Sequence, residues 1–416
     1  MPTTFNALLC RTGAALLLAV CAGSANADVI IDWNEKAVAN VLARNMGPPP
    51  AERVIAMVHL AMFDAVNSIE PRYRPYVVQL PASAGTSKEA AAASAAASVL
   101  AALDPPKQVE IKTALAEYLA AVPAGEGKAQ GIALGEAVAA KVLQTRADDG
   151  AATPDAYRYP TRPGVYVPTP VMFVPMWPGV KPFAMSGAAQ FRPAEPIALT
   201  SAEWTADYNE IKALGSRNST TRSARQTEDA RFWLATGGNV YYPVARSLAK
   251  SKNLSLIENA RLFALVAAAR LDATIAVFDA KYHYGFWRPI TAIRNGDIDE
   301  NPSTERDAAW QPIADTPMHP EYPCAHCILA SSMAGVLQTV LGAAELPEFS
   351  TTSPTMPGAT HRWTDLRAFV TEVSEARIFA GFHYRFSTSV GADMGWKIGE
   401  LTAKTMLQPS VTADAR

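Results

Sequence analysis

Apolar residues recur every three to four positions along most of this chain, which is the period of an α-helix with one buried face. Residues 52–67 show the pattern plainly, with Val54, Val58 and Met62 on one stripe. The same reasoning predicts further helices, which are, in chain order, residues 88–103, 105–122, 127–146, 202–214, 227–236, 255–282, 324–341, 364–384 and 391–406.

Residues 154–196 interrupt this helical pattern. The segment holds ten prolines, and each proline fixes φ and removes an amide donor. Aromatic residues such as Tyr157, Trp177 and Phe183 argue against a floppy linker, so we expect the segment to wrap over helices and to connect two bundles. The predicted fold class is all-α: an N-terminal helical bundle over 28–152, a proline-rich connection over 153–200 and a C-terminal helical domain over 201–410.

The first 27 residues have the features of an export signal. One positive charge, at Arg11, precedes a short apolar core at 14–22, and Ala25-Asn26-Ala27 supplies a cleavage pattern before Asp28. We therefore expect a periplasmic or secreted protein. Residues 327–344 carry no charge, but their serine, threonine and glutamine favour a buried bundle helix, so no membrane span is expected after signal cleavage.

The charge balance argues against nucleic acid as a partner. The formal net charge of the whole chain is −2, and removal of Arg11 with the signal makes it −3, so no broad basic surface is expected. Small molecules are the expected partners. The oligomeric state stays open, a homo-oligomer included.

The densest chemical signal begins at Lys281. Lys281 and Arg288 are seven residues apart, which is two helical turns, and share one face if the helix continues. Pro289 disfavours the α conformation at Arg288, which places that residue where the helix ends. Taken alone, the pair is better explained by a solvated helix end with amphipathic side chains, so it assigns no site by itself.

A second cluster reads His-Pro-Glu-Tyr-Pro-Cys-Ala-His-Cys from His319 to Cys327. Pro323 suits the first turn of a helix, whose free amides would face an anion. The helix end would lower the pKa of His326, which could then exchange protons with a bound group. Cys324 and Cys327 leave thiols, a disulfide or redox pair, and zinc ligation open.

The third cluster contains Arg377, His383 and Ser387. On the expected helix over 364–384, Arg377 and His383 border one cavity. Ser387 follows His383 by four residues, which is one helical turn, so its hydroxyl is placed to hydrogen-bond and orient the imidazole.

Taken in order, Lys-x6-Arg-Pro, Tyr-Pro-Cys-Ala-His and Arg-x5-His resemble the three-part signature shared by type 2 phosphatidic-acid-phosphatase-like enzymes and vanadium-dependent haloperoxidases. The match spans about a quarter of the chain. The surrounding words Phe-Trp-Arg-Pro, His-Pro-Glu-Tyr-Pro and His-Tyr-Arg-Phe are more similar to the haloperoxidase branch.

The resemblance implies a role for each matched residue. Lys281, Arg288 and Arg377 would neutralise the oxygens of vanadate or phosphate. His383 would be the axial vanadium ligand, or the nucleophile that becomes phosphohistidine. His326 would be the acid–base residue. His319 stands where bromide-oxidising members tend to have histidine and chloride-oxidising members phenylalanine.

Three positions depart from the family pattern. Cys324 and Ala325 replace the usual serine and glycine before the acid–base histidine, where both would contact the oxyanion. Cysteine is a weaker donor than serine, and the alanine methyl crowds the approach of an anion. Ser387 replaces the usual aspartate and would raise the basicity of His383 less.

Three functions follow as hypotheses. The first is a vanadium-dependent haloperoxidase that oxidises halide with hydrogen peroxide at His383-bound vanadate. The second is an exported acid phosphatase that needs no cofactor and hydrolyses a phosphomonoester through phosphohistidine. The third, favoured by the three departures, is a non-catalytic anion-binding envelope protein.

Overall fold

The computed structural model describes residues 28–410 except 159, 161, 169 and 343–345, and it confirms a predominantly α-helical fold. The expected export signal lies outside the described residues. The first part of the chain forms α1 (Val29–Ala43), α2 (Pro48–Ile69), α3 (Lys88–Leu103), α4 (Gln108–Ala120) and α5 (Glu126–Thr145). The later part forms α6 (Ala202–Leu214), α7 (Ala224–Phe232), α8 (Gly238–Ser251), α9 (Leu256–Tyr284), α10 (Pro289–Arg294), α11 (Ala325–Leu341), α12 (Leu366–Phe379) and α13 (Arg385–Thr405).

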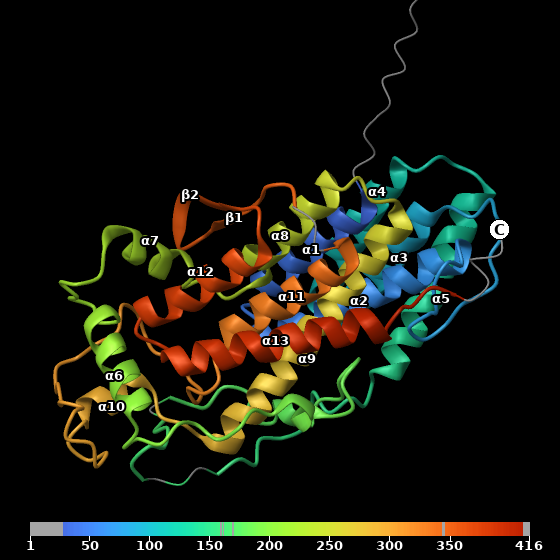
Figure 1. Ribbon diagram of the computed structural model, residues 1–416. Coiled ribbons are helices and arrows are strands. Elements are labelled where there is room, and N and C mark those ends of the chain that lie inside the picture. Colours follow the sequence, from blue (N-terminus) through green and yellow to red (C-terminus); the bar gives the residue numbers. More distant parts are fainter. Residues whose placement is uncertain (1–27, 159, 161, 169, 343–345, 411–416) are drawn as a thin grey trace, which may run out of the picture.

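Helix α9 lies at the centre of the molecule (Figure 1). Helix α2 from the first part packs against it, as do α11 and α13 from the later part. A buried ion pair joins the two parts, because Arg270 of α9 donates to Glu52 of α2, with an Nε–Oε2 distance of 3.1 Å. Buried apolar side chains of α1–α5, α7–α9 and α11–α13 form one continuous cluster, and those of α6 and α10 belong to a second cluster. The division of the chain at 152 and 200 therefore stays a prediction.

Two short 3₁₀ turns of the connecting segment (residues 154–196), η2 (Trp177–Gly179) and η3 (Ala188–Phe191), pack against α9. Asp272 of α9 accepts hydrogen bonds from the amides of Phe183, Ala184 and Met185. Buried carboxylates need such donors, and this one fastens the connecting segment to the central helix.

Some elements were not predicted from the sequence. Helix α8 contains Pro243, which lacks an amide donor and masks the helical pattern. Helix α1 follows directly on the expected signal. In the described residues the only sheet is a two-stranded antiparallel hairpin, β1 (Phe349–Ser353) and β2 (Met356–Trp363), in which Thr351 pairs with His361.

The predicted helix over 364–384 is wrong at its C-terminal end. Helix α12 stops at Phe379, and Gly381 adopts a φ of 80°, which favours glycine and redirects the chain. Helix α13 then begins at Arg385. His383 consequently lies in a short linker between two helices, so His383 and Ser387 do not share a helical face.

Hydropathy gives no sign of a bilayer span. Across residues 28–410, leaving aside the six undescribed positions, no helix combines the length and the apolar composition that crossing requires. In the uncharged stretch that begins at Cys327, residues 327–337 are buried in α11, as the sequence predicts.

Candidate active site

Three cations converge from three different elements. Lys281 lies in the last turn of α9, Arg288 caps the N-terminus of α10, and Arg377 lies in the last turn of α12. All three side chains are buried. Helix α9 ends at Gly285, which has a left-handed φ of 60°. Arg288 has an extended backbone conformation beyond that end, so Lys281 and Arg288 do not share a helical face.

Burial makes each of these charges costly. It lowers the pKa of Lys281 far below its usual value, and the neighbouring Arg288 lowers it further. It also lowers the pKa of Arg288 to about 10 and that of Arg377 to about 9. The carboxylate of Glu321 raises the pKa of both Lys281 and Arg288 and so partly offsets this effect of burial. The cluster therefore has an excess of buried positive charge that an anion would offset.

The contacts of His383 fix its tautomer. Arg288 Nη1 lies 3.3 Å from His383 Nε2, and a guanidinium only donates, so Nε2 is the acceptor nitrogen. His383 Nδ1 then carries the hydrogen and donates to Glu321 Oε1 at 2.8 Å. Burial and the neighbouring cations lower the pKa of His383 well below its usual value. The result is a neutral imidazole with the lone pair of Nε2 on the side of Arg288.

Glu321 was not predicted from the sequence as a functional residue. Its Oε1 accepts from His383 Nδ1 and from the amide of Tyr384, and its backbone carbonyl accepts from Lys281 Nζ at 2.7 Å. Burial raises the pKa of Glu321 to about 7, which Lys281 and Arg288 oppose. A carboxylate inside the apolar His-Pro-Glu-Tyr-Pro motif was the available signal.

This contact also corrects the expected role of Ser387. The imidazole of His383 is held by Glu321, which comes from the loop before α11, rather than by the hydroxyl of Ser387. Ser387 is fully buried, and its nearby hydroxyl helps to lower the pKa of Glu321. Ser387 therefore contributes to the site through Glu321.

Cys324 does not play the predicted oxyanion-binding role. It forms a disulfide with Cys327, so no thiol is available as a donor or as a zinc ligand. Its backbone amide donates to the carbonyl of Ser387 at 3.2 Å. Cys324 instead caps α11, because its sulfur accepts from the amide of Cys327. Ala325, the other predicted contact, lines the chamber described below.

Arg377 and His326 both contact backbone carbonyls of the short loop between α7 and α8. Arg377 Nη1 donates to the carbonyl of Trp233, whose indole is held by Glu372 at 3.0 Å. Within the described chain, the buried Arg377 Nε has no hydrogen-bond partner. His326 Nε2 lies 3.3 Å from the carbonyl of Ala235, which can only accept, so Nδ1 is left as the basic nitrogen. Burial and Arg377 lower the pKa of His326 well below its usual value.

His319 joins the same hydrogen-bonded group. Arg288 donates from Nη2 to His319 Nδ1 at 3.0 Å and from Nε to the His319 carbonyl at 2.9 Å. The imidazole packs at 5.2 Å from the ring of Phe278. Thus His319 lies between Arg288 and an aromatic wall, and burial lowers its pKa well below the usual value.

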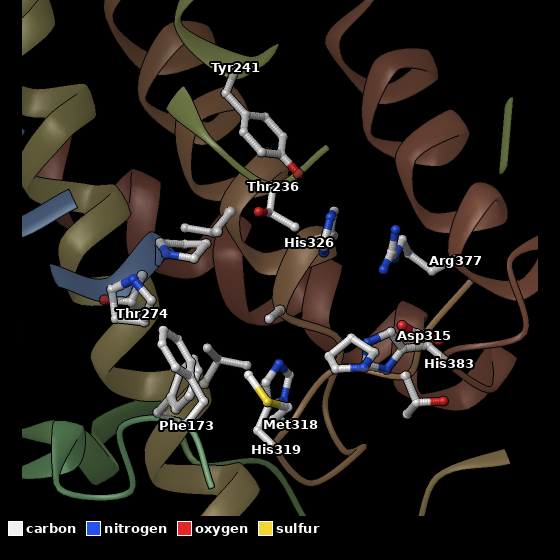
Figure 2. A pocket seen from close by; sticks show the side chains of 18 residues that line it. Phe173, Thr236, Tyr241, Thr274, Asp315, Met318, His319, His326, Arg377 and His383 are labelled. Atoms are coloured by element: carbon white, nitrogen blue, oxygen red, sulfur yellow. The ribbon is translucent and has the colours of Figure 1, made fainter. Parts of the chain in front are cut away.

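A chamber of about 460 Å³ opens beside this group (Figure 2). His326, Arg377 and His383 border one side of it, with Ala325 at the start of α11. The other side is largely apolar and includes Phe173 of the connecting segment. Lys281 and Arg288 lie outside the chamber lining and reach the group through Glu321, His319 and His383.

Comparison with known proteins identifies this arrangement. Residues 261–410, which hold every predicted site residue, match the family described as the VCPO second helical-bundle domain. The vanadium chloroperoxidase of Curvularia inaequalis is 27% identical over 400 residues, covering 74% of this chain. The chain spans 64% of the length of that relative.

Over residues 261–410 the chain is similar to vanadium haloperoxidases. Solved structures share its fold over nearly the whole chain. A bacterial vanadium-dependent iodoperoxidase superposes with a TM-score of 0.78 at 21% identity, covering 92% of this chain and 97% of its own. A holo-type bacterial vanadium-dependent chloroperoxidase gives a TM-score of 0.70 at 16% identity, covering 86% and 92%.

The residues present suit the vanadate that this family implies. The unpartnered Arg377 Nε is a buried donor that an oxyanion would satisfy. His383 Nε2 offers a lone pair, as a neutral histidine ligand must. Its other nitrogen is held by a carboxylate, which is the arrangement that orients metal-bound histidines and raises their basicity.

Proposed function

We propose that this protein is a vanadium-dependent haloperoxidase that oxidises halide with hydrogen peroxide. The observation that carries the proposal is the neutral His383, whose Nε2 lone pair is surrounded by buried cations and whose Nδ1–H is fixed by Glu321. When bound, vanadate would supply a Lewis-acidic centre that activates peroxide toward halide.

Each side chain has a distinct task in this proposal. Lys281, Arg288 and Arg377 hold the oxyanion by charge, and their burial strengthens that attraction because water screens it less. His383 binds through Nε2. His326 exchanges a proton at Nδ1, since its Nε2–H is directed at the carbonyl of Ala235.

A paired assay tests this function. Purified mature protein, with and without orthovanadate, is assayed for peroxide-dependent bromination of a phenolic dye and for hydrolysis of a phosphomonoester. We expect bromination that requires vanadate and that falls at least a hundredfold in His383→Ala, because the ligand is removed. Glu35→Gln, a change at an exposed residue, serves as the control.

The other two hypotheses correspond to other outcomes of the same assay. Hydrolysis that vanadate inhibits, without bromination, would contradict the proposal and support the acid phosphatase. There the same Nε2 lone pair would attack phosphorus. Silence in both assays, under reducing and oxidising conditions, would support a non-catalytic anion-binding protein.

We also propose that the protein is exported to the periplasm or secreted. The signal-like pattern of residues 1–27 supports export, and so does the Cys324–Cys327 disulfide, since disulfides persist in oxidising compartments. Mass spectrometry of the mature protein should give Asp28 as the first residue. A cytoplasmic product that retains residues 1–27 would contradict export.

A further inference from the structure

The chamber beside His383 has two chemically different walls. One carries His326, Arg377 and His383, with Asp315 beside them (Figure 2). The opposite wall is apolar and is built from α2, the connecting segment, α9, the loop before α11, and α11 itself. Its members are Pro49, Phe173, Val277, Phe278, Met318 and Leu329. The two walls face one space, so an occupant contacts both.

Halide and peroxide would fill only a small part of this chamber. Each is about the size of one or two water molecules, roughly 30 Å³ apiece, whereas the chamber holds about 460 Å³. Pockets of roughly 300–1,000 Å³ with apolar walls and a few polar groups are typical of sites for small organic molecules. Neither small reactant gains from contact with the apolar wall.

The apolar wall is held in place by specific contacts. The Phe173 amide donates to the Met318 carbonyl at 2.9 Å, and its carbonyl accepts from the Tyr282 hydroxyl. Its ring packs edge-on against Phe278 at 6.1 Å and covers Gly47, where an added Cβ would lie 2.1 Å from the ring. The ring of Phe173 is therefore fixed where it borders the chamber.

A polar atom is also left free in the lining. Tyr241 is buried, and its hydroxyl has no hydrogen-bond partner among the residues that the structure describes. Figure 2 shows Tyr241 and Thr236 on the same side of the chamber as His326. A buried hydroxyl without a partner costs free energy, which a hydroxyl on a bound molecule would recover.

We propose that the chamber binds a hydroxylated aromatic molecule of the phenol class and that halogenation takes place there, inside the protein. A flat ring suits the aromatic wall, and a phenolic hydroxyl suits Tyr241 and the cationic wall. This inference rests on the proposed function, which supplies the halogenating species.

The reaction balances with the named reactants. Hydrogen peroxide oxidises halide and takes up one proton, which gives hypohalous acid and water. The ring carbon of the phenol then attacks the halogen, forming a carbon–halogen bond and displacing hydroxide. The ring loses its proton to His326 Nδ1 or to water, and the displaced hydroxide is neutralised to water, so halogen passes from the hypohalous acid to the ring.

Two measurements on the same proteins test the proposal. Binding of 4-fluorophenol is followed by fluorine NMR, with and without orthovanadate. Phenol halogenation is compared with the oxidation of iodide to triiodide, which needs no organic acceptor. Phe173→Ala removes an aromatic contact, Val277→Phe fills the chamber, and Val109→Phe, at a residue that is 78% exposed on α4, is the matched control.

We expect one binding site in the wild type and about tenfold weaker binding in Phe173→Ala, since an aromatic contact contributes about 1–1.5 kcal/mol. The ratio of phenol halogenation to triiodide formation should fall by a similar factor, while Val109→Phe matches the wild type. Phe173 is only half-buried, so this variant keeps the test valid if Val277→Phe does not fold.

Four results separate the possible failures. Unchanged affinity in both chamber variants would overturn the proposal, and so would products with the same ring positions as those from free hypohalite. Triiodide formation without phenol binding would also overturn it while leaving the proposed function standing. Phenol binding without triiodide formation would support the binding site and contradict the haloperoxidase.

Discussion

At the scale of single residues, the site depends on how His383 is held. Arg288 and Glu321 contact opposite nitrogens of its imidazole, so the ring can neither flip nor change tautomer without losing a hydrogen bond. The carboxylate comes from the loop before α11 and not from α13, where Ser387 occupies the position expected to orient the ring. The geometry that prepares Nε2 for an anion therefore depends on a residue outside the His-Tyr-Arg-Phe motif.

The first prediction concerns this carboxylate. Glu321→Gln should weaken orthovanadate binding by about tenfold or more, because partners that orient metal-bound histidines typically contribute 10–100-fold. Equilibrium titration with orthovanadate measures the effect. Addition of Ser387→Asp should recover part of the loss, because the buried Ser387 side chain lies close enough to Glu321 to lower the pKa of that carboxyl, so a carboxylate at 387 is placed beside the same group.

Recovery of vanadate binding by Ser387→Asp would show that Glu321 positions His383 and does not only stabilise the fold. If Glu321 served only the fold, Ser387→Asp would add a second buried polar change and weaken binding further. Binding by Glu321→Gln with wild-type affinity would contradict the role altogether.

At the scale of elements, the site depends on close packing between α11 and α13. Gly395 of α13 faces Ser331 and Ile328 of α11, and a Cβ there would lie 1.9 Å from Ser331 Oγ and 2.4 Å from the Ile328 carbonyl. Helix α11 carries His326, while α13 follows directly on His383. The distance between the two histidines is thus set by a helix contact that admits no side chain.

Gly395→Ala should therefore lower the free energy of unfolding by about 1–3 kcal/mol, the range typical of overpacked cores. Chemical denaturation measures the change. Gly85→Ala is the control, since no described atom lies within 4 Å of an added Cβ there. Equal stability of the two variants would contradict the packing described.

The stability that Asp272 contributes by holding the connecting segment against α9 should depend on pH. Burial raises the pKa of Asp272 from 3.8 to about 6, against the three amides that donate to it. Between pH 4 and 6 the folded protein holds a proton that the unfolded chain releases, so the wild type loses stability as pH rises through this range. The unfolding free energy of wild type minus that of Asp272→Asn should fall by on the order of 3 kcal/mol between pH 4 and 7.

Groups other than Asp272 titrate in both proteins, so their effect cancels in the difference between the two unfolding free energies. A difference that instead rises with pH would show that the three amide hydrogen bonds outweigh burial and hold the carboxylate ionised.

The sequence predicts some features of the site better than others. Order and spacing grouped Lys281, Arg288, Arg377 and three histidines in one predicted site, and the structure places these side chains around the same hydrogen-bonded group and chamber. Order and spacing could not show that Gly381 ends α12 early, since a glycine inside an otherwise helical pattern is tolerated in many helices. Glu321 was missed because its contact with His383 joins residues 62 positions apart.

At the scale of the whole molecule, the first part of the chain is fastened to the site through one buried network. Arg270 of α9 binds Glu52 of α2 and the carbonyl of Leu329 on α11, and its guanidinium lies 4.5 Å from the ring of Tyr241. Tyr241 and Leu329 both line the chamber. The helices before residue 150 thus help to shape the site, although the matched family domain begins at 261.

Glu52→Gln should lower the free energy of unfolding by about 3–5 kcal/mol, because it leaves Arg270 buried without a counter-charge. Thermal and chemical denaturation give the value. Glu35→Gln removes an exposed partner of Arg246 and should cost less than about 1 kcal/mol. Similar losses in the two variants would contradict the role given to the buried pair.

The central claim is that His383 and the three buried cations bind a tetrahedral oxyanion as vanadate. Isothermal titration of the purified protein with orthovanadate tests it most directly. We expect one vanadate per chain in the wild type, binding at least a hundredfold weaker in His383→Ala, and competition by phosphate. Absence of binding by the folded wild type, or equal affinity in His383→Ala, would contradict the account.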